Sequence, residues 1–137
     1  MPHLLIFTSA YDYETRLTGI EVPVILRHEN EATQFSAKID TGSSFCIFRR
    51  GDGEKLGLDI ELGESVRINT VTGSFLAYGH ELSVTVLGIE TTSTVYFAAD
   101  DNFRRNVLGR QGWLDRIRLG LLDYEGRLYL SAYDEPQ

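Results

Sequence analysis

Short strand-like segments separated by turns recur along this 137-residue sequence, and they constrain its fold more than any other feature. The segments are rich in β-branched and aromatic residues, and several alternate between apolar and polar positions as half-buried strands do. A succession of this kind predicts an all-β domain, either a barrel or a sandwich. The predicted strands cover residues 20–27, 34–39, 66–72, 75–87, 91–98, 119–123 and 127–131.

Helix signals are few. Residues 52–57 are predicted to form one short turn of helix that ends at the final glycine of the segment, because glycine commonly follows a helix C-terminus. Residues 111–117 are the better candidate, since Trp113, Leu114 and Ile117 are spaced to share one helical face. The sequence therefore predicts an all-β fold with one short helix near its C-terminus.

Length, charge and cysteine content exclude several classes of protein. A chain of this length suits a single domain over residues 1–137. The 13 basic and 20 acidic residues give a net charge of −7, which argues against a nucleic-acid-binding surface. A single cysteine, Cys46, excludes an internal disulfide framework. Because the sequence has no apolar run of about 18 residues and no signal-peptide pattern, we expect no membrane segment and a cytoplasmic location.

The sharpest candidate for chemistry is the sequence Asp-Thr-Gly-Ser at residues 40–43. It follows the strand-like residues 37–39 and precedes the apolar residues 45–48, so the Asp40 carboxylate lies on a tight turn between two apolar segments. The glycine lets a ligand or another part of the backbone approach closely. Taken alone, the motif also fits an ordinary β-turn in which the aspartate forms a local cap.

Two further segments give this motif a context. Residues 107–110 read Val-Leu-Gly-Arg and come just before the predicted C-terminal helix, and residues 72–74 form a glycine-centred turn between two predicted strands. In this order, the segments resemble those of the retropepsin family of aspartic proteases. Residues 39–43 match its catalytic loop, residues 107–110 its Gly-Arg signature and residues 70–74 the tip of its flap. The resemblance covers residues 20–130 and implies a closed, all-β acid-protease barrel.

The resemblance also implies roles for individual residues. Asp40 would be the catalytic carboxylate, Thr41 would form a hydrogen bond across a two-fold axis, and Gly42 and Ser43 would support the loop, with Ser43 next to the outer carboxylate oxygen. A flap would close over the peptide, and a structural motif would open the C-terminal helix. The flap residues would be Val71, Thr72, Gly73 and Ser74, and the residues of the structural motif would be Leu108, Gly109 and Arg110.

The number of carboxylates determines the expected assembly. An aspartic protease needs two carboxylates that share a proton, whereas only Asp40 of this chain is followed by Thr-Gly or Ser-Gly. The second carboxylate must come from another copy of the chain across a two-fold axis. The expected protein is therefore an aspartic endopeptidase that is active as a homodimer and cleaves peptide or protein substrates.

Some features depart from the family or leave alternatives open. Ser44 and Phe45 stand where viral members usually carry an acid, so Arg110 lacks its usual partner. Residues 1–18 have no clear counterpart, and the predicted hairpin at the C-terminal end could form the dimer interface instead. Two other hypotheses remain: a non-catalytic, dimeric peptide-binding module of the same fold, or a structural β-domain with an accidental Asp-Thr-Gly. No cofactor or metal is implied, because the three histidines lack ligand spacing.

Overall fold

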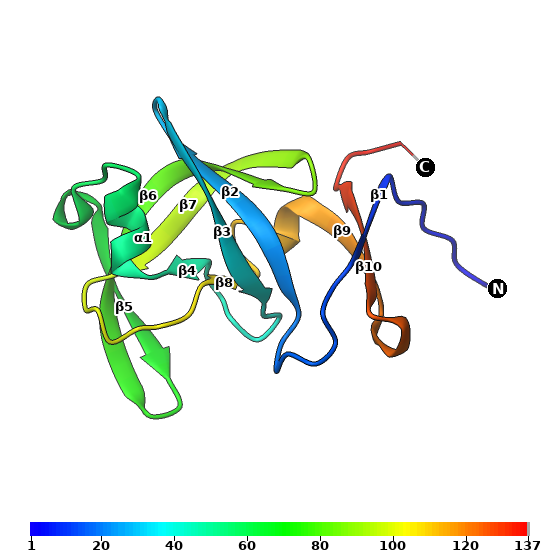
Figure 1. The fold of residues 1–137 in the computed structure, drawn as a ribbon, viewed down its shortest axis with the longest axis horizontal. Helices are drawn as coiled ribbons and strands as arrows, with labels where there is room; N and C mark the ends of the chain where they lie inside the picture. The colour runs from blue at the N-terminus through cyan, green and yellow to red at the C-terminus, as the bar shows by residue number, and fades with distance from the viewer. Residues whose placement is uncertain (137) are drawn as a thin grey trace.

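The computed structural model describes residues 1–136, which form mostly β-structure. Figure 1 shows a small sheet with both chain termini at one end of the molecule and the β5–β6 hairpin at the other. The strands are β1 (Ser9–Asp12), β2 (Glu21–His28), β3 (Glu31–Ile39), β4 (Ile47–Phe48), β5 (Glu64–Thr70), β6 (Gly73–Val86), β7 (Ile89–Ala98), β8 (Val107–Leu108), β9 (Ile117–Leu122) and β10 (Arg127–Ala132).

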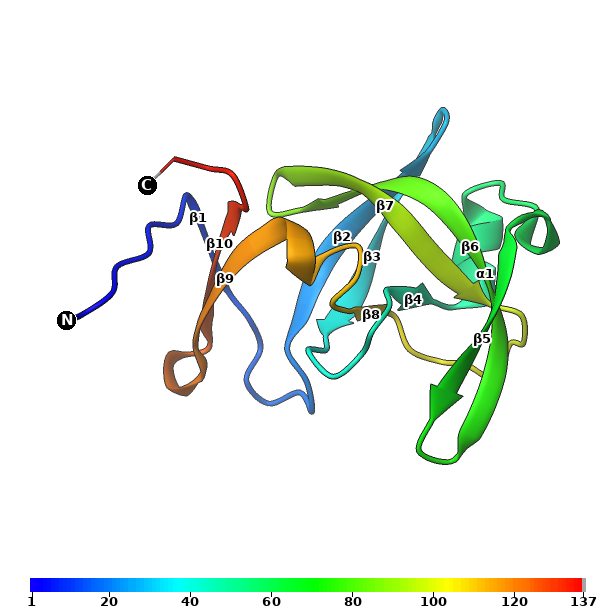
Figure 2. The same ribbon diagram turned by 180° about the vertical axis from the view of Figure 1, so that it is seen from behind.

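The larger sheet has the strand order β2-β3-β8-β4-β7-β6-β5, and β2 also pairs with β6. Two very short strands, β4 and β8, lie at its centre: β8 is parallel to β3, and β4 is parallel to β7. The residues that connect β3 to β4 and those around β8 are therefore held close together. Figure 2 shows the long β6–β7 hairpin from behind, crossing the molecule beside these central strands.

Alternation of side chains along β2 explains why this segment forms a strand. Val22, Val24 and Leu26 are fully buried, whereas the residues between them face outward or are half-buried. Pro23 lies where β2 pairs with β3 alone, because the pairing with β6 covers only Ile25 to Arg27. This position suits proline, which has no amide proton to donate to a second neighbour.

The prediction of a C-terminal helix over residues 111–117 is wrong in the type and the length of the helix. Only Leu114–Arg116 (η2) is helical there, as a single turn of 3₁₀ helix. Gly112 has a φ of +104°, which an α-helix does not tolerate, and its amide donates to Asp115 Oδ1 (3.0 Å). The chain then becomes extended at Ile117, where β9 begins.

Among the described residues the one α-helix is α1 (Arg50–Lys55), which overlaps the short helical turn predicted over residues 52–57. Gly57, with a φ of +77°, closes it through a hydrogen bond from its amide to the Glu54 carbonyl oxygen (3.0 Å). Two further 3₁₀ turns, η1 (Ile60–Leu62) and η3 (Asp123–Glu125), lie in connections between elements. None of the helices in the described residues is long and apolar enough to span a membrane.

The smaller sheet, the terminal sheet, consists of β1, β10 and β9 in that order. Residues 1–18 had no counterpart in the family resemblance, but part of this segment forms β1, in which Ser9 to Asp12 pair with Leu130 to Arg127. Tyr13 continues this attachment: its hydroxyl donates to Asp123 Oδ1 (2.5 Å). Burial, and then the hydrogen bond and negative charge of Asp123, raise the pKa of Tyr13 to about 12.

Two groups of apolar side chains fill the molecule. The main core lies between the larger sheet, the region of η2 and the terminal sheet, and Trp113, Phe48, Phe97 and Leu108 are among its fully buried members. A smaller cluster lies beside the β5–β6 hairpin. Its buried members are Ile47, Ile68, Ala77 and Val107, with Phe45, Val66, Phe75, Tyr96 and Phe103 packed against them.

Candidate active site

Asp40 follows directly on β3 and is held mainly through backbone groups. Its own amide donates to the Leu108 carbonyl oxygen in β8 (3.0 Å), and its carbonyl oxygen accepts from the Ser43 amide (3.1 Å). The Gly42 amide donates to the carboxylate oxygen Oδ1 (2.9 Å), and the side chain remains half-buried. The turn therefore fixes one oxygen of the Asp40 carboxylate while the residue keeps access to solvent.

The other residues of the predicted catalytic loop lie around this turn. Thr41 and Gly42 are exposed, so Thr41 is available to a second molecule. The Ser43 hydroxyl donates to the Phe45 carbonyl oxygen (2.7 Å), whereas the contact to the Asp40 carboxylate comes from the Gly42 amide. Within a single chain, Ser43 therefore tightens the loop and has no bond to the carboxylate.

The Leu-Gly-Arg segment supports the loop from behind. Leu108 is fully buried, and the amides of Arg110 and Gln111 donate to the carbonyl oxygens of Ser43 and Ser44 (2.9 Å each). Gly109 allows this approach: a Cβ there would lie 2.2 Å from the Phe45 carbonyl oxygen. This position therefore needs glycine for space between two backbones.

The side chains of Arg110 and Cys46 also have defined places beside the loop. Arg110 is exposed, and its guanidinium makes no hydrogen bond or ion pair with the described residues. Cys46 is fully buried, and its sulfur accepts from the Gly109 amide (3.4 Å). Burial is the main cause that raises the pKa of the Cys46 thiol to about 11, so it is a packing group and a poor nucleophile.

Asp40 opens onto a cavity of about 830 Å³ that lies between its loop, the β5–β6 hairpin and the connection from β7 to β8. The residues that line it are Asp40, Gly42, Ser43, Ser44, Phe45, Ile47, Arg67, Ile68, Asn69, Thr70, Val71, Phe75, Asn102, Phe103, Arg104, Arg105 and Val107. Asp40 is the one carboxylate in this set, and much of the rest is apolar. Such a cavity suits an extended chain with apolar side chains.

The β5–β6 hairpin, termed the flap hairpin here, ends in a two-residue loop. Thr70 pairs with Gly73 across it, and the Thr70 hydroxyl donates to the Gly73 carbonyl oxygen (3.1 Å). Val71, at the tip, is fully exposed and lines the Asp40 cavity. The other three predicted flap residues line a neighbouring cavity on the hairpin: Thr72, Gly73 and Ser74.

A buried polar network behind the site was not predicted. Asp52 of α1, only 2% exposed, accepts a hydrogen bond from Asn106 Nδ2 (2.7 Å) and pairs with Arg49 (3.2 Å). Asn106 also accepts from the Arg49 amide (2.9 Å) and donates to the Ser36 carbonyl oxygen (3.2 Å). These bonds tie α1 to the residue just before β8. In the sequence, the signal that could have indicated this network was a polar residue, Asn106, directly before the apolar pair Val107–Leu108.

Comparison with known proteins places the fold in a defined class. No model of a known protein family matches the sequence, and no curated protein is similar to it at the sequence level. The chain nevertheless has the fold of the retropepsin-like aspartic proteases, as the resemblance of the motifs predicted.

Two solved structures carry this result. A retropepsin-like aspartic protease from Rickettsia conorii is similar over 96% of this chain and 100% of its own, with a TM-score of 0.63 and 17% identity. The EIAV protease, solved with the inhibitor HBY-793, is similar over 68% of this chain and 83% of its own, with a TM-score of 0.55 and 17% identity. At this identity the likeness concerns the fold.

Proposed function

We propose that this chain is an aspartic endopeptidase that works as a homodimer, with Asp40 from each copy forming the catalytic pair. One observation carries the proposal: a single carboxylate, held by the Gly42 amide, lines a cavity beside the flap hairpin in a chain with the retropepsin-like fold. The pairing of β2 with both β3 and β6 supports the closed barrel implied by the motifs. A single domain over the whole chain and a cytoplasmic location stay predictions of the sequence.

The chemistry follows from two carboxyl groups that share one proton. The ionised Asp40 accepts a proton from a water molecule, whose oxygen forms a bond to the peptide carbonyl carbon. The protonated Asp40 of the second copy gives its proton to the carbonyl oxygen, which yields a tetrahedral diol. The first Asp40 gives the proton it took from water to the amide nitrogen, while the Asp40 of the second copy takes a proton from one diol hydroxyl as the C–N bond breaks. The two peptide products, one with a new carboxyl group and one with a new amine, then leave. The flap hairpin would exclude water during these steps.

The dimer is the part of the proposal on which activity depends. Asp40 is the one carboxylate in its cavity, and a lone carboxylate cannot act as both acid and base in this scheme. Thr41 is exposed next to it and free to contact a second copy. Leu121 and Leu122 of the terminal sheet and Tyr124 of the adjoining η3 are exposed apolar residues that suit an interface between copies.

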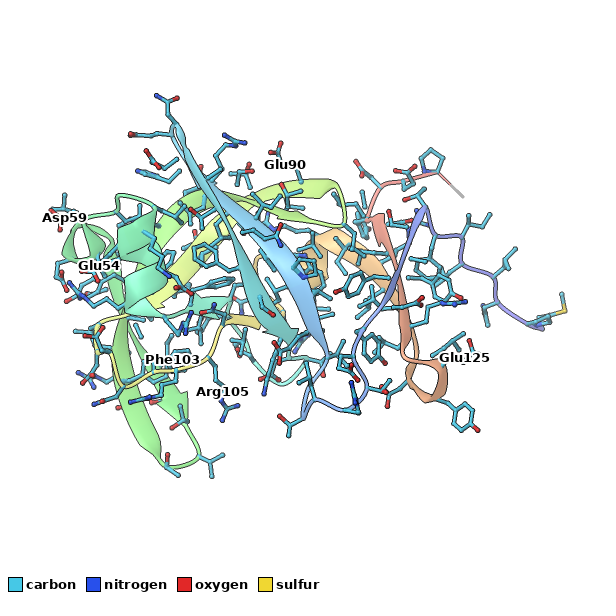
Figure 3. The ribbon with its side chains drawn as sticks, in the orientation of Figure 1. Glu54, Asp59, Glu90, Phe103, Arg105 and Glu125 are labelled. Carbon is cyan, nitrogen blue, oxygen red and sulfur yellow. The ribbon has the colours of Figure 1, made fainter. Side chains whose placement is uncertain are left out.

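Cleavage of a peptide library by the intact chain tests the proposal. We expect wild-type protein to cleave and to sediment as a dimer, and Asp40→Asn to abolish cleavage while the dimer persists. Asp59→Asn is the matched control, because Asp59 is exposed, is not among the residues that line the Asp40 cavity and lies away from the tip of the flap hairpin (Figure 3). Cleavage by Asp40→Asn at the wild-type rate, or a purely monomeric active species, would refute the assignment. A dimer that binds peptides and never cleaves them would favour the binding-module hypothesis.

A further inference from the structure

One wall of the Asp40 cavity combines apolar and cationic side chains on a single connection, residues 99–106 between β7 and β8. Phe103 is half-buried, and its ring stacks on that of Phe75 in the flap hairpin (centroids 5.0 Å apart, planes at 29°). Arg104 and Arg105 follow it directly and line the same cavity. In Figure 3 the Arg105 side chain projects downward from the connection, the direction in which the flap hairpin also extends. The stacked rings therefore fix the base from which both arginines project.

These arginines have no acidic partner within the described residues. Neither Arg104 nor Arg105 forms a hydrogen bond or ion pair through its side chain, and both are exposed. Some arginines elsewhere in the chain are paired, as Arg50 is with Glu61 and Arg127 with Asp12, whereas Arg110 is unpaired like these two. Arg104 and Arg105 differ from Arg110 because they line the Asp40 cavity, so their N–H donors are available to a molecule bound there.

A third arginine adds to this charge. Arg67 of β5 lines the cavity on the flap side, where its guanidinium donates a long hydrogen bond to the Ser74 hydroxyl (3.4 Å). The cavity is thus lined by three exposed arginines and by one carboxylate, that of Asp40. Positive charge in a concave site with apolar walls attracts and orients anionic ligands more strongly than the same charge on an open surface.

The apolar part of the cavity lies next to these cations. Ile47, Ile68 and Val107 are buried in the smaller cluster and also line the cavity. An extended peptide places successive side chains on opposite sides, so one apolar and one charged side chain can be bound at neighbouring sites. Recognition of nucleic acid fits this wall poorly, because the chain as a whole is acidic.

We infer that the substrate is a peptide that carries an acidic side chain close to an apolar one at the cleaved bond, and that Arg104 and Arg105 bind the acidic group. This inference rests on the proposed function, which it narrows to a class of substrate. Arginine presents several N–H donors in a plane and binds a carboxylate through two of them at once. Arg104 and Arg105 are thus the residues that set the preference for a negative charge.

A matched pair of peptides tests this preference. The best-cleaved acidic peptide of the library is prepared with Glu and with Gln at its acidic position, and kcat/KM is measured for both with the intact dimer. We expect a preference for the Glu peptide of about tenfold, the factor that one charge-assisted hydrogen bond contributes. In the double variant Arg104→Gln, Arg105→Gln the ratio should fall close to one. The Lys double variant, which retains both charges, should keep part of the preference.

The control variant is Arg27→Gln, which removes the same charge from an exposed position on β2, outside the cavity. It should keep the wild-type ratio. Cleavage without any enrichment of acidic residues near the cut, or an unchanged ratio in the Gln double variant, would overturn the inference and leave the protease assignment intact. If no peptide is cleaved, the protease assignment fails. The pair is then prepared from the acidic library peptide that binds most tightly, and fluorescence anisotropy of its labelled Glu and Gln forms decides the inference, since equal affinities for the two refute it.

Discussion

Replacing Gly109 by alanine should disturb the Asp40 loop more than any other change of one methyl group in this region. The added Cβ would lie 2.2 Å from the Phe45 carbonyl oxygen and 2.7 Å from that of Ser43. Carbon and oxygen atoms that are not bonded to each other stay roughly 3.3 Å apart even in close contacts, so the two segments must separate by about 1 Å. Both atoms belong to the backbone, and no flexible side chain can yield in their place.

The separation has two measurable consequences. Overpacking of this kind costs about 1 to 3 kcal/mol of unfolding free energy, which lowers the urea midpoint by roughly 1 M. It also pulls the hydrogen bond from the Arg110 amide to the Ser43 carbonyl oxygen (2.9 Å) out of range and moves the loop that carries Asp40. A misplacement of about 1 Å near reacting groups lowers the rate by a factor on the order of 100.

Urea unfolding followed by circular dichroism gives the first quantity, and cleavage of the best library peptide gives the second. Gly51→Ala is the control, because Gly51 lies in α1 and its Cβ would meet no atom within 4 Å. This variant should equal the wild type or gain about 0.5 to 1 kcal/mol, since alanine favours a helix. A Gly109→Ala protein with the wild-type midpoint would refute the packing argument, and a destabilised one that cleaves at the wild-type rate would refute the link to catalysis.

Three further variants or measurements test other features. Asn106→Ala removes three hydrogen bonds and leaves Asp52 without a buried donor, so we expect a loss of about 2 to 4 kcal/mol in urea unfolding; a loss below about 1 kcal/mol contradicts the network. Tyr13→Phe should be less stable than wild type by about 1 kcal/mol below pH 10. In the folded protein the pKa of Tyr13 is raised from 10.0 to about 12, so the wild type should lose this advantage in unfolding free energy as the pH rises from 10.0 to about 12. A difference in unfolding free energy that stays constant over this pH range contradicts the hydrogen bond to Asp123. Native protein at pH 8 should expose Cys46 to a thiol reagent only as fast as it unfolds, and a rapid reaction contradicts its burial.

Local patterns predicted the elements whose structure depends on nearby residues. The alternation of Val22, Val24 and Leu26 identified β2, and the turn near Gly73 identified the flap hairpin to within a few residues. Asp-Thr-Gly and Leu-Gly-Arg were recognised as a pair, and the structure brings them together through backbone hydrogen bonds. Sequence reasoning succeeded here because glycine and apolar periodicity have strong local causes.

The remaining features depend on residues far apart in the chain. The prediction of a helix over residues 111–117 failed because the positive φ of Gly112 and the start of β9 at Ile117 leave room for only one turn of 3₁₀ helix. β1 was missed, since its four residues form a strand only by pairing with β10. Arg104 and Arg105 form only a short basic pair in an acidic sequence, which gives no local signal of a binding role. Their role in lining the cavity became visible once the connection between β7 and β8 was placed beside the flap hairpin.

The pairing of β1 with β10 has a consequence for the order of folding. Ser9 leaves the ribosome well before its partner Leu130, because the two residues lie far apart in the sequence. The larger sheet is made entirely from residues between these two strands, so it can form while β1 still has no partner. Contacts of such long sequence separation form slowly. We therefore expect the terminal sheet to assemble after the larger sheet, so that a dimer interface on this sheet would form later than the Asp40 loop and its cavity.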